Sequence, residues 1–169
     1  MSAALATYAY FVDGLVRQSE PKTILEIGLG EAATTADIIL QSIPRWGGKY
    51  IAMDMAPTEY AIKLLNKYPT ENWELRICDS QNEKNLIQFD CGTSIDLLLI
   101  DGAHNENNCY SDTTRGLIIS NLNFQHGIVV WHDIFFNRVR YAINKVATEF
   151  NLDVFYFANM NLAVGKYKL

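Results

Sequence analysis

Thr23-Ile24-Leu25-Glu26-Ile27-Gly28-Leu29-Gly30 is an apolar run that ends in two closely spaced glycines. Its first five residues are typical of a strand covered on both faces, because such strands carry nearly continuous apolar side chains. Gly28 permits a sharp turn, and Gly30 permits a close approach of the backbone to a ligand. Helical spacing of apolar residues begins directly afterwards, over 32–43. The segment therefore predicts a strand, a tight turn and a helix.

The same alternation continues on both sides of this segment. Further strands are expected at 49–54, 74–78, 95–100, 127–131, 153–157 and 161–165, and further helices at 4–18, 58–68, 82–89, 106–120 and 135–149. Repeated strand–helix alternation indicates right-handed βαβ units and a mostly parallel sheet. The last two strands are joined only by 158–160, so we expect an antiparallel hairpin at one edge. The chain is expected to form a single α/β domain over 1–169, with an N-terminal helical segment 1–20 and a Rossmann-like core 21–169.

Composition favours a small-molecule partner. The chain has 169 residues and a net charge of −5, which argues against a broad basic surface for nucleic acid. No apolar run approaches the roughly 20 residues of a membrane span, so no membrane partner is expected. The three cysteines show no CxxC spacing, and the apolar run 3–12 has no basic leader. These features predict a cytoplasmic protein with reduced thiols.

The glycine loop alone leaves more than one interpretation open. Gly28-x-Gly30-x-x-Ala33 is a degenerate form of the dinucleotide fingerprint, which normally has a third glycine. Glu26 favours S-adenosylmethionine, because a carboxylate suits the cationic amino-acid end of that cofactor and would repel a pyrophosphate. A tight turn without a ligand is the remaining alternative.

Acidic residues also follow the next two strands. Asp54 ends the second strand, where a carboxylate can accept both ribose hydroxyls. Asp79 and Ser80 follow the third strand, in a position to reach the adenine edge. Each of them alone is an ordinary helix-capping or turn residue. Together with Glu26 they place three acidic strand ends on the rim where α/β sheets bind ligands, which favours S-adenosylmethionine.

A second group of polar residues follows the fourth and fifth strands. Asp101 is followed three positions later by His104, and the fifth strand ends in His132-Asp133. Two carboxylates and an imidazole can hold Mg²⁺ or Mn²⁺, which would lower the pKa of an acceptor hydroxyl. His104 is the candidate base. In the alternative interpretation, Asp133 caps the next helix and His132 is a core residue.

Four positions remain open between two roles. Asp112 either orients a histidine or faces solvent. Tyr8, Tyr10 and Phe11 either line a substrate pocket, or pack in the core or at a subunit interface.

These motifs resemble those of class I S-adenosylmethionine-dependent methyltransferases. Within that class they are similar to the group of small O-methyltransferases that includes macrocin- and mycinamicin-type sugar methyltransferases and cephalosporin-hydroxylase-like proteins. The resemblance spans about residues 20–167, and it rests on the motifs 24–30, Thr34-Thr35, Asp54, 78–80, 96–104 and 127–133.

The resemblance implies a sheet ordered 3-2-1-4-5-7-6 with strand 7 antiparallel, and O-methylation of a small hydroxylated acceptor. The expected cofactor residues are Glu26, Gly28, Gly30, Thr34, Asp54, Met55, Asp79, Ser80 and Asp101. The expected metal ligands are Asp101, His132 and Asp133, with His104 and Asp101 as catalytic residues. One departure is that His132 stands where the sugar methyltransferases carry a carboxylate.

Other functions remain as alternatives. One is an S-adenosylmethionine-binding protein with a hydroxylase-like or regulatory role and no methyl transfer. An NAD-dependent dehydrogenase is disfavoured by the missing third glycine and by the final hairpin. Nucleic-acid base methylation is disfavoured by the acidic charge and by the lack of an Asn/Asp-Pro-Pro-aromatic motif. Because the chain is short, either its substrate site is open to solvent or a homodimer partner completes the pocket.

Overall fold

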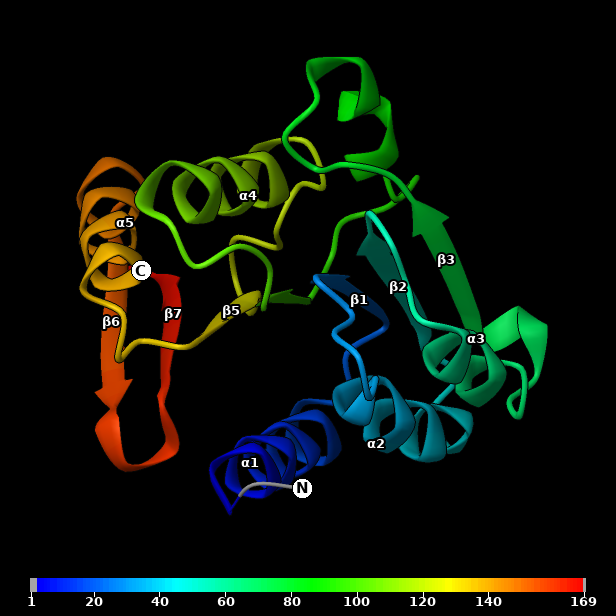
Figure 1. Ribbon diagram of the computed structural model, residues 1–169. Coiled ribbons are helices and arrows are strands. Elements are labelled where there is room, and N and C mark those ends of the chain that lie inside the picture. Colours follow the sequence, from blue (N-terminus) through cyan, green and yellow to red (C-terminus); the bar gives the residue numbers. More distant parts are fainter. Residues whose placement is uncertain (1–2, 169) are drawn as a thin grey trace.

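The computed structural model describes residues 3–168, and it contains a seven-stranded sheet between two layers of helices (Figure 1). The strands are β1 (Thr23–Ile27), β2 (Lys49–Asp54), β3 (Trp73–Ile77), β4 (Leu97–Ile100), β5 (Ile128–His132), β6 (Leu152–Phe157) and β7 (Leu162–Tyr167). Their order in the sheet is β3-β2-β1-β4-β5-β7-β6, and β7 is antiparallel to both of its neighbours. The expected fold class, strand order and terminal hairpin are confirmed.

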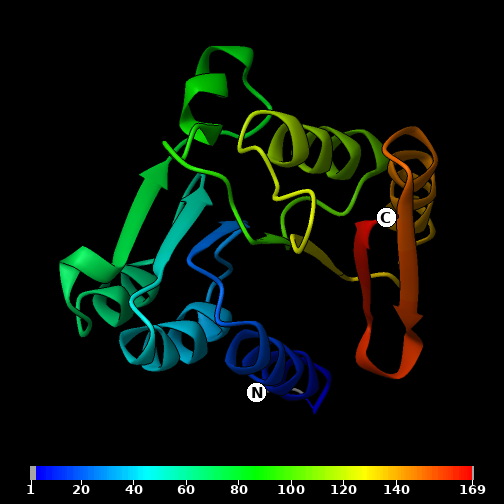
Figure 2. The same cartoon turned by 180° about the vertical axis from the view of Figure 1, so that it is seen from behind.

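The helices divide between the two faces of the sheet (Figures 1 and 2). One face is covered by α1 (Ala3–Ser19), α2 (Thr34–Ser42) and α3 (Glu59–Leu65), and the other by α4 (Glu106–Ile118) and α5 (Asn137–Glu149). Short 3₁₀ helices are η1 (Ile43–Arg45), η2 (Thr70–Asn72), η3 (Glu83–Phe89) and η4 (Ala158–Met160). The helix expected at 82–89 is therefore a 3₁₀ helix. Residues 1 and 2 of the expected N-terminal segment lie outside the described residues.

The core consists of two apolar clusters separated by the sheet. Successive strand residues point to opposite faces, so Ile24 packs on the side of α1 and α2, while Leu25 and Ile27 pack on the side of α4 and α5. All three side chains are buried. Burial of each such side chain contributes roughly 1.5–3 kcal/mol. Apolar packing on both faces therefore stabilises the sheet. The polar residues that follow the strands lie at its carboxyl ends, outside this core.

The loop after β1 makes an unusually close contact with β4. The Gly28 amide donates a hydrogen bond to the Met53 carbonyl at 2.9 Å, and the residue has φ of 91°. A Cβ at this position would lie 2.3 Å from the carbonyl oxygen of Asp101, which no side chain tolerates. Gly30 has φ of 67° but faces open space. Gly28 is thus required for the packing of two strand ends, and Gly30 only for its backbone conformation.

The structure bears on two further expectations, the reduced thiols and the lack of a membrane-spanning segment. Cys78, Cys91 and Cys109 are free thiols. Within residues 3–168, no helix has the length and apolar character needed to cross a membrane.

Gly28→Ala is expected to lower the free energy of unfolding by more than about 3 kcal/mol, because backbone strain adds to a clash with Asp101. Gly30→Ala is the matched control. It introduces only the left-handed strain and is expected to cost about 1–2 kcal/mol. Denaturant titration of both variants measures the difference, and equal losses would contradict the close-approach argument.

Candidate active site

A cleft lies at the carboxyl ends of β1, β2 and β3, beside the glycine loop. Its volume is about 200 Å³. Five of the residues expected to bind the cofactor line it, namely Gly28, Asp54, Met55, Asp79 and Ser80. The structure therefore brings together residues that are separated by up to two strands in the sequence.

Asp54 connects the end of β2 to the glycine loop. One carboxylate oxygen, Oδ2, accepts a hydrogen bond from the Leu29 amide at 2.9 Å. The other, Oδ1, accepts one from the Ala56 amide at 2.8 Å. A carboxylate offers about four acceptor positions, so Asp54 can still accept from hydroxyl groups in the cleft. Its two backbone bonds fix its orientation before any ligand arrives.

The loop after β3 is held by α4. The Gln81 side-chain amide donates to Asp112 Oδ1 at 2.7 Å, and the Arg115 guanidinium donates to the Ser80 carbonyl. Asp112 is only 1% exposed, and burial raises its pKa to about 6. Both roles considered for Asp112 from the sequence are wrong, because its bonds go to the loop after β3. Gln81 and Arg115 were missed, since neither belongs to a recognisable motif.

Glu26 does not line the cleft. Its side chain is 1% exposed and accepts a hydrogen bond from the hydroxyl of Tyr50 on the neighbouring strand. Burial raises the pKa of Glu26 to about 8, although the bond from Tyr50 opposes this shift. The carboxyl group is thus largely protonated at neutral pH. Gly30, Thr34 and Asp101 are not among the lining residues either. The cofactor roles of all nine expected positions stay predictions.

Next to the cleft, a second group of polar residues comes together at the carboxyl ends of β4 and β5. Ligand atoms of Asp101, His132 and Asp133 all lie within 4.8 Å of one another. His132 Nδ1 lies 2.9 Å from Asp101 Oδ1 and 3.3 Å from Asp133 Oδ2. His104 Nε2 lies 2.6 Å from the same Asp133 oxygen. The four residues singled out from the sequence therefore form one connected cluster.

The cluster carries opposite charges in close contact. Burial lowers the pKa of His132, but the carboxylates of Asp101 and Asp133 more than offset this and hold the pKa at about 9. Burial raises the pKa of Asp133, whereas the hydrogen bond and charge of His132 lower it overall. At neutral pH, His132 is thus an imidazolium between two carboxylates.

Asn161 in the turn between β6 and β7 fixes Asp133. Its side-chain amide donates to Asp133 Oδ1 at 2.7 Å, and its Oδ1 accepts from the Phe135 amide at 2.9 Å. Asp133 has φ of 58°, and the N-cap of α5 is Phe136. The alternative in which Asp133 caps that helix is therefore wrong. Asn161 was missed, although its own φ of 55° is one that asparagine tolerates in a turn.

Tyr8 closes the cluster from the side of α1. Its ring centre lies 4.2 Å from that of His132. The Tyr8 hydroxyl and His132 Nε2 are both buried, and neither has a hydrogen-bond partner among the described residues. Tyr8 is thus a core residue against the site. Phe11 packs against Phe157 with ring centres 5.4 Å apart, and Tyr10 is exposed.

His104 is the accessible member of the cluster. Its side chain is 46% exposed and stacks on the Phe136 ring, with centres 4.9 Å apart and planes 12° apart. Asp133 holds one ring nitrogen, so the orientation of the imidazole is fixed while one edge faces solvent. This arrangement suits a residue that exchanges protons with a bound molecule.

A family model described as a methyltransferase domain matches residues 25–134, which contain both the cleft and the cluster. The chain belongs to this methyltransferase family. Its strand order is that of class I S-adenosylmethionine-dependent methyltransferases, so the resemblance stated from the sequence is confirmed.

Solved structures show the same fold at low sequence identity. Podospora anserina methyltransferase PaMTH1, solved with S-adenosylhomocysteine, is 16% identical with a TM-score of 0.77, and the match covers 100% of this chain and 80% of that one. The O-methyltransferase TomG of Streptomyces achromogenes, solved with S-adenosylmethionine, is 16% identical with a TM-score of 0.75 and coverage of 100% and 82%. CalS11, a TDP-rhamnose 3'-O-methyltransferase of calicheamicin biosynthesis, is 14% identical with a TM-score of 0.77 and coverage of 99% and 82%. No curated protein sequence matches the chain.

Asp112→Asn is expected to remove a pH dependence of stability. The pKa of Asp112 is about 6 in the folded methyltransferase against an ordinary 3.8, so between these values the folded state binds more protons than the unfolded state. The wild type should therefore lose up to about 3 kcal/mol relative to the variant as the pH rises from about 4 to 6. Denaturant titrations across this range measure the difference. Asp153→Asn on the surface is the control, and a wild-type slope retained in Asp112→Asn would refute the assignment.

Tyr50→Phe is expected to lower the free energy of unfolding by about 1–3 kcal/mol, because it leaves the buried carboxyl of Glu26 without its partner. Tyr8→Phe removes a buried hydroxyl that has no such partner and is expected to leave stability unchanged or to raise it. Thermal and chemical denaturation compare the two variants. A loss in Tyr8→Phe as large as that in Tyr50→Phe would show that the Tyr8 hydroxyl is satisfied after all.

Proposed function

We propose that this methyltransferase transfers the methyl group of S-adenosylmethionine to a hydroxyl group of a small acceptor, with the help of a divalent metal. The observation that carries the proposal is the convergence of Asp101, His104, His132 and Asp133 directly beside the cleft at Gly28. One half of the site is suited to hold a nucleoside, and the other half to hold and deprotonate a hydroxyl group.

In this proposal the cofactor occupies the cleft. Asp54 accepts hydrogen bonds from the ribose hydroxyls, and the loop at Asp79 and Ser80 contacts the adenine. Met55 is 68% exposed at the lip of the cleft, where it can cover the bound base. The cofactors found in PaMTH1 and TomG support this assignment, since both proteins share the fold.

His104 acts as the general base. Asp133 orients its ring through Nε2, and the carboxylate stabilises the imidazolium that forms when the acceptor hydroxyl gives up its proton. Phe136 fixes the ring plane by stacking. The protein otherwise contributes positioning, because the hydroxyl oxygen, the methyl carbon and the sulfur of the cofactor must lie in line.

The residues present fit a divalent metal. Asp101, His132 and Asp133 offer two carboxylates and one imidazole, a donor set suited to Mn²⁺ or Mg²⁺. His132 would release its proton on binding the ion, so metal affinity is expected to rise with pH. A bound ion would act as a Lewis acid and lower the pKa of the reacting hydroxyl.

The acceptor is proposed to be a small molecule with adjacent hydroxyl groups, such as a sugar. CalS11 methylates a sugar and has the same fold, which supports this class of acceptor.

Calorimetric titration with S-adenosylhomocysteine, with and without Mn²⁺, tests the cofactor and the metal. We expect micromolar binding of S-adenosylhomocysteine, and Mn²⁺ binding that is lost in Asp133→Asn. Absence of S-adenosylhomocysteine binding would refute the proposed function. Binding without methyl transfer to any sugar or other diol tested would favour the alternative of a regulatory or hydroxylase-like protein.

His104→Gln is expected to lower kcat about 100-fold or more, the usual contribution of a general base, with little change in S-adenosylhomocysteine affinity. His126→Gln is a matched control, because His126 is also exposed and contacts a carboxylate, that of Asp96, at 3.1 Å. Methyl transfer measured with labelled cofactor compares the two variants. Equal activities would exclude His104 as the base.

A further inference from the structure

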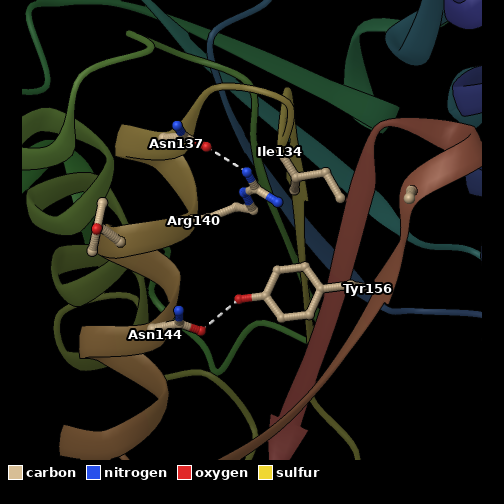
Figure 3. Close-up of a pocket in the computed structure, with 7 residues that line it drawn as sticks. Ile134, Asn137, Arg140, Asn144 and Tyr156 are labelled. Atoms are coloured by element: carbon tan, nitrogen blue, oxygen red, sulfur yellow. Dashed lines mark hydrogen bonds between the residues drawn. The ribbon is translucent and has the colours of Figure 1, made fainter.

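A groove between α5 and β6 is lined by residues that the proposed chemistry does not use (Figure 3). Its volume is about 500 Å³, against about 200 Å³ for the cofactor cleft. A volume of this size lies within the range typical of small-molecule sites. The lining side chains on which the argument rests are Ile134, Asn137, Arg140, Tyr141, Asn144 and Tyr156.

The groove begins next to the candidate centre for methyl transfer. Ile134 lines it and directly follows Asp133 in the chain. At the other strand, Ala158 lines the groove from the same turn in which Asn161 binds Asp133. The groove and the cofactor cleft share no lining residue. A molecule whose hydroxyl lies at His104 could therefore extend its distal part into the groove.

Arg140 is the one charged side chain among the described residues that line the groove. Figure 3 shows its guanidinium and the ring of Tyr156 projecting into the same space from α5 and β6. One guanidinium nitrogen donates to Asn137 Oδ1, and no carboxylate of the described residues pairs with this arginine. Most of its five N–H donors are thus left for a ligand, and their planar geometry matches phosphate oxygens. A cationic groove is notable in a chain of net charge −5.

The remaining walls suit a polar ring. Tyr141 is 66% exposed and Tyr156 is 42% exposed, so their rings offer flat apolar surface to a ligand. The Tyr156 hydroxyl donates to Asn144 Oδ1 at 2.7 Å and retains its own acceptor capacity. The amide groups of Asn137 and Asn144 have free donors as well. The groove therefore combines one anion-binding group with aromatic and amide contacts.

We propose that this groove binds the phosphate-bearing end of the methyl acceptor, and that the acceptor is a hydroxylated compound linked to a nucleoside diphosphate. The inference rests on the proposed function, because it assumes that an acceptor lies at His104. Arg140 contacts the phosphate groups, and the two tyrosines contact the nucleoside.

Uridine diphosphate, pyrophosphate and uridine serve as probes in calorimetric titrations of the full chain. We expect uridine diphosphate to bind at least about tenfold more tightly than either pyrophosphate or uridine, because it uses both parts of the groove. Arg140→Gln should weaken its binding at least about tenfold. Arg138→Gln removes the same charge from the same helix outside the groove, and should change the affinity less than twofold.

Titration with S-adenosylhomocysteine accompanies each variant and reports on folding and on the cofactor cleft. If S-adenosylhomocysteine binds but uridine diphosphate does not, the groove proposal is overturned while the proposed function stands. Equal uridine diphosphate affinity in Arg140→Gln and Arg138→Gln would also overturn it. Equal affinity for pyrophosphate and uridine diphosphate would overturn the contact with the nucleoside. If S-adenosylhomocysteine fails to bind, the proposed function itself fails.

Discussion

The contact between Gly28 and the backbone of Asp101 joins the two halves of the site. Because position 28 has no side chain, the turn after β1 lies against the end of β4, with no room for even one carbon atom between them. The glycine loop then borders the cofactor cleft, and Asp101 begins the polar cluster on the other side. A larger residue at position 28 would move the cleft and the polar cluster apart. In the proposed function the methyl group passes between these two parts of the site.

The two carboxylates of the cluster are stabilised by the residues around them. The carboxylates of Asp101 and Asp133 have oxygens within 4.8 Å of each other and would repel, and the partly buried imidazolium of His132 offsets that repulsion. Asn161 holds Asp133 in a left-handed conformation that aspartate adopts at some energetic cost. In the proposed function, a divalent ion would take the place of the proton on His132 between the same two carboxylates.

The sequence predicted most of the fold, because continuous apolar runs and helical spacing are local properties. It also predicted which polar strand ends come together, since parallel strands bring their carboxyl ends to one rim. It could not predict Asn161 or Tyr8, which reach the cluster from the terminal hairpin and from α1 through tertiary packing. Glu26 is the opposite case, a residue that the motif placed in the cofactor site but that does not line the cleft. Its side chain is buried and accepts a hydrogen bond from Tyr50 on the next strand, which the local sequence did not indicate.

This contrast follows the architecture of the site. The cofactor side is built largely from turns that directly follow β1, β2 and β3, so a short stretch of sequence specifies each contact. The proposed acceptor groove lies between α5 and the terminal hairpin, and residues distant in the chain, such as Arg140 and Tyr156, face each other there. Local motifs therefore carry the identity of the cofactor. If the acceptor binds in the proposed groove, its identity depends on how the last hairpin packs against α5, which no local motif specifies.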